Sequence, residues 1–108
     1  MAQNFRRYTS NAVGTSPAAV YTANSYDAIV GISLSNILGT AINVSCYIND
    51  GSNNIYLVKD APIPTGGSLQ ILDGGAKFVV QASDVLSVVS DTASSCDVWV
   101  SAVDEIST

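Results

Sequence analysis

Apolar and polar residues alternate with a period of two along most of this 108-residue chain. In residues 26–36 the alternation places Ala28, Val30, Ile32 and Leu34 on one side of an extended segment. The opposite side takes the intervening residues, which are Asp27, Ile29, Gly31, Ser33 and Ser35. No stretch of a dozen residues repeats apolar positions at helical spacing, so the alternation predicts β-strands rather than helices.

A second clear strand is predicted at residues 41–50, where four apolar side chains face inward and Tyr47 faces outward. The inward residues are Ile42, Val44, Cys46 and Ile48. Shorter candidate strands lie at residues 19–23, 54–59, 67–72, 77–82, 84–90 and 96–103. About eight strands at this spacing predict an all-β fold, a single-domain antiparallel β-sandwich of the jelly-roll or immunoglobulin-like kind. The pairs Asp50–Gly51 and Asp73–Gly74 tolerate positive φ and predict hairpin turns.

A stiff segment, "APIPTGG", separates two of the predicted strands. Pro62 and Pro64 cannot donate ladder hydrogen bonds, so this stretch has to leave the sheet or follow its edge. Gly66 and Gly67 then allow a sharp turn before the next strand. We therefore expect a crossover between the two sheets of the sandwich.

Length and charge limit the classes of partner. A chain of 108 residues forms one core, and nine acidic against four basic side chains give a formal charge of −5. Such a surface repels phosphate backbones, so we expect no nucleic acid partner. No apolar run reaches the roughly 20 residues of a membrane span, and the start lacks the apolar core of a signal peptide. We expect a soluble chain that is made in a cytoplasm.

The first 18 residues differ from the rest, because their apolar residues have no clean period. We interpret residues 1–18 as an N-terminal arm or extended segment and residues 19–108 as the β-sandwich domain. The arm would lie on a neighbouring subunit and pair its arginines with carboxylates there. A partly ordered tail is an equal alternative.

Two aromatic side chains are predicted to face outward from strands. If Cys96, Val98 and Val100 face the core, Trp99 is exposed, as Tyr47 is on its own strand. Exposed aromatic rings suggest a contact patch, although Trp99 could equally lie under a segment of its own chain. The candidate interface residues are Phe5, Arg6, Arg7, Tyr8, Tyr47 and Trp99.

The side chains needed for most catalysis are missing. The chain has no histidine, and its two cysteines, Cys46 and Cys96, are fifty residues apart and predicted to be buried, where they could be neighbours. The acidic residues lie mostly at turns and strand starts, where carboxylates usually bond to backbone N–H groups. We expect no enzymatic activity, no catalytic residues, no metal and no cofactor.

Three stretches together resemble a known group of proteins. They are "RRYTSNAVGTSPAAVYTANSYDAIVGISLSN", "YLVKDAPIPTGGSLQIL" and "SDVLSVVSDTASSCDVWVSAVDEIST". Their order and motifs are similar to those of small virion structural proteins of tailed bacteriophages, especially contractile-tailed phages of marine cyanobacteria. The chain departs slightly from the opening "NVGT" motif at Ala12. The shared motifs are strand ends, a crossover and turns, and they carry no catalytic residue.

The resemblance implies a β-sandwich subunit of the virion, made in the host cytoplasm and bound to other virion proteins such as the major capsid or tail protein. We expect a capsid decoration or cement-type protein, homo-oligomeric in the particle, that docks through sheet edges and the N-terminal arm. The alternative is a neck, tail or baseplate and fibre component. In that case the chain could be a module that recognises the host surface.

Overall fold

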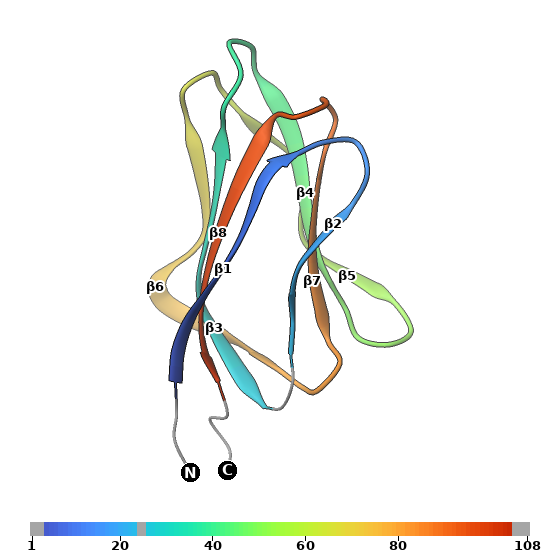
Figure 1. Cartoon of the computed structure of the whole chain (residues 1–108), viewed down its shortest axis with the longest axis vertical. Helices are drawn as coiled ribbons and strands as arrows, with labels where there is room; N and C mark the ends of the chain where they lie inside the picture. Colours follow the sequence, from blue (N-terminus) through green and yellow to red (C-terminus); the bar gives the residue numbers. More distant parts are fainter. Residues whose placement is uncertain (1–3, 24–25, 105–108) are drawn as a thin grey trace.

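The computed structural model describes residues 4–23 and 26–104. In these ranges the regular elements are eight strands, joined by turns and bends (Figure 1). They are β1 (Asn4–Val13), β2 (Ala18–Thr22), β3 (Asp27–Asn36), β4 (Ile42–Asn49), β5 (Asn54–Ile63), β6 (Ser68–Val80), β7 (Val85–Ser90) and β8 (Cys96–Asp104). The expected all-β class is confirmed.

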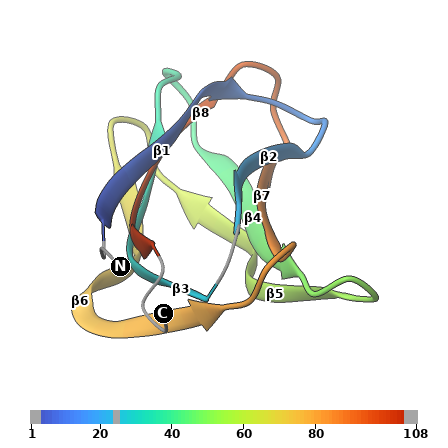
Figure 2. The ribbon, with the colours of Figure 1, turned by 60° about the horizontal axis from the view of Figure 1, so that its bottom comes forward.

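The strands form two four-stranded antiparallel sheets that face each other (Figure 2). The first sheet has the order β1-β8-β3-β6, and the second has the order β2-β7-β4-β5. The chain changes sheet at every connection except the β4–β5 hairpin. This connectivity is that of a jelly roll, one of the two sandwich types that the sequence predicts.

The core lies between the sheets and takes side chains from both. Ile32, Leu34 and Val100 come from the first sheet, and Val44 and Val88 come from the second; none of them has measurable solvent exposure. Burying a side chain of this size contributes about 1.5–3 kcal/mol. The inward predictions for Ile32, Leu34, Val44 and Val100 are confirmed, whereas no inward side is predicted for the strand that contains Val88.

The predicted alternation in β3 is wrong at Asp27, Ile29 and Val30, although Ala28 is buried as expected. Ile29, which was expected to face outward, is fully buried, whereas Val30 is only half-buried. The register with both neighbouring strands shifts between Ile29 and Gly31, which marks an irregularity of the bulge type. One extra residue reverses the side-chain phase, so Asp27 is also buried, and the Tyr21 hydroxyl donates a hydrogen bond to its carboxylate.

The predicted hairpin at Asp73–Gly74 is also wrong. The expected strands at residues 67–72 and 77–82 are one strand, β6, which pairs with β3 along its length. The pairing moves from Asp73 opposite Gly31 to Phe78 opposite Ile29, so the additional β6 residues form an irregularity within the strand. Residues that suit a turn also suit a bulge, because both need unusual backbone angles.

The Asp50–Gly51 turn and the crossover are confirmed. Gly51 has φ 99°, and the Asp50 carboxylate accepts hydrogen bonds from the backbone N–H groups of Ser52 and Asn53. β5 ends at Ile63 in the second sheet and β6 begins at Ser68 in the first. Between them the Gly67 N–H donates to the Pro64 carbonyl at 2.9 Å.

Asn36, the last residue of β3, holds this crossover in place. Its Nδ2 donates to the carbonyl oxygens of Ile63 at 3.1 Å and Pro64 at 3.2 Å, and also to that of Thr40 at 2.7 Å. Its Oδ1 accepts from the Leu38 N–H at 2.8 Å. One buried amide therefore ties the end of the first sheet to the segment that arrives from the second.

Candidate interface surfaces

The six candidate interface residues do not form one surface. Residues 4–13, which belong to the segment interpreted as an arm or extended segment, form edge strand β1 of the chain's own first sheet. Seven consecutive β1 residues, from Asn4 to Ser10, pair with β8 in unbroken register. Whether any part of this segment also touches another subunit stays a prediction.

Phe5, Arg7 and Trp99 share the outer face of the first sheet. Phe5 lies opposite Val103, and Thr9 lies opposite Trp99, so the odd-numbered residues of β1 and β8 are on the same side. Phe5 is 81% exposed and Trp99 is 52% exposed, which confirms that Trp99 faces outward. The guanidinium carbon of Arg7 lies 5.6 Å from the centroid of the Trp99 ring, a cation–π distance.

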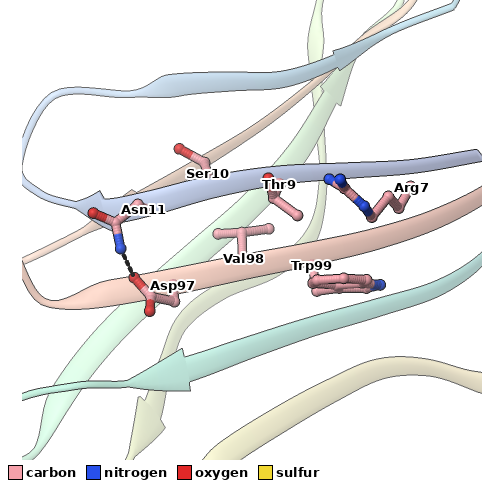
Figure 3. Close-up of a pocket in the computed structure, with 7 residues that line it drawn as sticks. All are labelled: Arg7, Thr9, Ser10, Asn11, Asp97, Val98 and Trp99. Atoms are coloured by element: carbon pink, nitrogen blue, oxygen red, sulfur yellow. Dashed lines mark hydrogen bonds between the residues drawn. The ribbon is translucent and has the colours of Figure 1, made fainter.

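A shallow groove of about 470 Å³ runs along this face beside Trp99 (Figure 3). It is lined by Arg7, Thr9, Ser10, Asn11, Asp97, Val98 and Trp99, all from β1 and β8. At one end of the groove, Asn11 Nδ2 donates to the Asp97 carboxylate at 3.0 Å. The groove combines an aromatic wall, a cation and a carboxylate on the outer face of the first sheet.

The same carboxylate also shapes the end of β1. The Ala12 N–H donates to Asp97 Oδ1 at 2.8 Å, and Ala12 has φ 54°, in the left-handed region. The register with β8 shifts between Ser10 and Val13 around this residue. Ala12 is where the chain departs from the motif it resembles, but neither Asn11 nor Asp97 was singled out from the sequence. Their pairing joins residues 86 positions apart, which no local pattern encodes.

Tyr8 and Arg6 differ from the outer-face residues. Tyr8 is half-buried and packs against the core, with its ring centroid 4.4 Å from that of Tyr21. Arg6 lies opposite Ala102, on the core-facing side of β1, yet it is exposed at the end of the sheet. Successive residues of a strand point to opposite sides. The side chains of Arg6 and Arg7 therefore lie on opposite faces of the sheet, both at its β1 edge.

Tyr47 lies on the second sheet, so the expected common Tyr47 and Trp99 face does not exist. Its ring centroid is 5.1 Å from that of Tyr56 on β5, and Lys59 Nζ lies 4.4 Å from the Tyr56 ring centroid. Tyr47 is half-buried, and Tyr56 is 43% exposed. Strand order caused the error, because β4 and β8 belong to different sheets.

Both cysteines are buried and free, as predicted. Burial, and to a smaller extent the neighbouring Cys96, raises the pKa of the Cys46 thiol to about 12. Burial, with a smaller effect of the Asp97 charge, raises the pKa of Cys96 to about 11. Both thiols therefore remain protonated at neutral pH.

In residues 4–23 and 26–104, no group of three or more Cys, Asp or Glu side chains has an arrangement that could hold a metal ion. In the same part of the chain there is no helix with the length and apolar character of a membrane span.

No protein-family model matches the chain, and no curated protein matches it. Solved structures do match. One is a chain in the acidic stable capsid structure of Helicobacter pylori bacteriophage KHP30, with a TM-score of 0.61 and 10% identity over 95% of this chain and 87% of that chain. Another, from Bacillus endospore appendages described as a novel family of disulfide-linked pili, has a TM-score of 0.54 and 20% identity over 94% of this chain and 84% of that chain. At these identities the likeness shows a common fold, shared over nearly the whole chain.

Proposed function

We propose that this chain is a structural subunit of a phage virion, and specifically a capsid decoration protein that docks on a repeating shell. The observation that carries the proposal is the likeness in fold to a chain in a phage capsid structure, which extends over 95% of this chain. A fold alone does not define a function. The motifs that resemble virion proteins of contractile-tailed cyanophages point independently in the same direction, and the cyanophage type itself is part of the proposal.

The surface chemistry suits docking better than catalysis. The groove beside Trp99 lies on an open sheet face, and the exposed aromatic residues Phe5, Trp99 and Tyr56 are on outer faces of the sandwich. Aromatic rings and arginine are enriched at the centres of protein interfaces. A subunit bound to a symmetric lattice needs such surfaces and no reaction centre.

The cysteines argue against assembly of the pilus kind. The appendages that share this fold are described as disulfide-linked. In this chain both thiols are fully buried and their pKa values are raised, so neither is available to a second subunit without local unfolding. We therefore propose non-covalent docking through the sheet edges and the N-terminal strand.

Copy number in purified particles tests the proposal. Quantitative mass spectrometry of particles from cells that produce the chain should find on the order of hundreds of copies, as a capsid lattice requires. Roughly six to eighteen copies would instead assign the chain to the neck, tail or baseplate. Absence from purified particles would overturn a virion role altogether.

A further inference from the structure

We infer that the open edge of β1 accepts an extended acidic segment of another protein, which adds to the first sheet as a fifth strand. The inference deepens the proposed function by naming the edge and the chemistry of its partner. Strand addition supplies main-chain hydrogen bonds as affinity and side-chain pairs as specificity.

Among the four edge strands, β1 has the longest regular stretch available for pairing. β2 has five residues and a register shift, and β6 has two register shifts against β3. β5 is interrupted by Asp60, with φ 51°, and by Pro62, which has no N–H to donate. In the described part of the chain β1 pairs with β8 alone, and its register from Asn4 to Ser10 is unbroken. Proteins usually protect edges with prolines, bulges, short strands or charged side chains. The stretch from Asn4 to Ser10 has no proline and no bulge, and its protection consists of Arg6 and Arg7, whose charge a strand with carboxylates would neutralise.

Charge decides between an acidic partner and a second copy of the chain. Arg6 and Arg7 supply two of the four basic side chains of a molecule with formal charge −5, and residues 4–13 contain no acidic side chain. Pairing β1 with another β1 in a register centred on Arg6 and Arg7 would bring the two arginine pairs towards each other, which like-charge repulsion opposes. A strand with carboxylates is attracted to the same position.

The partner's pattern follows from strand geometry. Arg7 lies on the outer face of the first sheet, so a complementary strand needs a carboxylate on that side. Two adjacent acidic residues in an extended segment meet this requirement. Arg7 is positioned by its contact with Trp99, at 5.6 Å, and Phe5 offers an apolar contact two residues away on the same face.

The test uses the full chain and a short capped peptide of Thr and Val residues with two adjacent Glu at its centre. The control peptide carries two Lys instead. We expect the acidic peptide to bind in an NMR titration, to slow hydrogen exchange of β1 amides, and to bind more weakly as salt is raised. The Lys peptide should not bind.

Matched variants locate the binding site. Arg7→Glu should weaken binding of the acidic peptide by roughly three- to tenfold. Lys59→Glu makes the same change in net charge at the other cation that lies over an aromatic ring, and it should leave binding within about twofold, because Lys59 is on the second sheet. Circular dichroism of both variants should match the unsubstituted chain.

Four outcomes would overturn the inference. They are failure of the acidic peptide to bind, equal binding of both peptides, protection of amides at another edge, and concentration-dependent dimerisation through β1 in sedimentation. These results would leave the proposed function standing if particles contain hundreds of copies. Conversely, the chain could be absent from purified particles although the acidic peptide binds to β1. That result would overturn the virion role and leave the inference about the β1 edge standing.

Discussion

On the outer face of each sheet a basic side chain lies over an aromatic ring, but the edge strands beside the two pairs differ. On the first sheet Arg7 lies over Trp99 at 5.6 Å, and on the second Lys59 lies over Tyr56 at 4.4 Å. The first pair borders the regular edge of β1, whereas the second borders β5, which Asp60 and Pro62 interrupt. A cation over an aromatic ring therefore does not define a docking site by itself, because the adjoining edge decides whether a strand can be added.

The largest expected loss of stability comes from substitutions in the core, and it should be of similar size for the two sheets. Leu34 on β3 and Leu86 on β7 are both buried, and they enter the core from opposite sheets. Leu34→Ala and Leu86→Ala should each lower the free energy of unfolding by about 2–5 kcal/mol, because each leaves a cavity. Urea denaturation measures both. A cost below about 1 kcal/mol for either variant would contradict tight packing of that sheet.

A smaller loss of stability is expected at the buried polar residues, and its size should differ between the two sheets. Asn36 bonds to three carbonyls and one N–H, whereas the buried Ser45 on β4 accepts a single bond, from the Asp60 N–H at 2.9 Å. We expect Asn36→Ala to cost about 3 kcal/mol and Ser45→Ala about 1 kcal/mol in the same denaturation assay. Equal costs would show that Asn36 does not hold the crossover.

The two thiols, one from each sheet, should make stability depend on pH in alkaline solution. Their pKa values are about 12 and about 11 in the folded chain, above the ordinary value of 9.0. Above pH 9 the unfolded chain loses these protons first, so rising pH favours unfolding by at most about 1.4 kcal/mol per thiol and pH unit. The stability of a Cys46→Ala, Cys96→Ala variant should fall less steeply between pH 9 and pH 10. Parallel slopes would contradict buried, protonated thiols.

The smallest effects are expected at the exposed rings. Trp99→Ala and Tyr56→Ala should each change the free energy of unfolding by less than about 1 kcal/mol, because both rings are on outer faces. Fluorescence sharpens the comparison, since Trp99 is the only tryptophan. Its emission should be typical of an exposed indole in the isolated chain and should shift to the blue on docking. Strongly blue-shifted emission from a proven monomer would contradict an exposed Trp99.

Local alternation predicted the all-β class, the inward side of β4, the outward position of Trp99 and the strands other than β1 and the continuous β6. It did so because a strand with one buried side carries its pattern in consecutive residues. The crossover was also predictable, since Pro62 and Pro64 have no N–H to donate and Gly66 accommodates φ 71°. The Asp50–Gly51 turn followed from the same kind of local chemistry.

Tertiary structure alone decided which segments became partners. Residues 4–13 form a sheet strand through pairing with β8 at the opposite end of the chain, and the groove joins Asn11 to Asp97 across 86 positions. The irregularity at Val30 reversed the phase of β3, and the order of strands placed Tyr47 and Trp99 on separate sheets.

The sequence by itself determined which residues alternate, because that depends on neighbours in the chain. Register and strand order depend on distant backbone groups finding hydrogen-bond partners, so only the folded chain determines them.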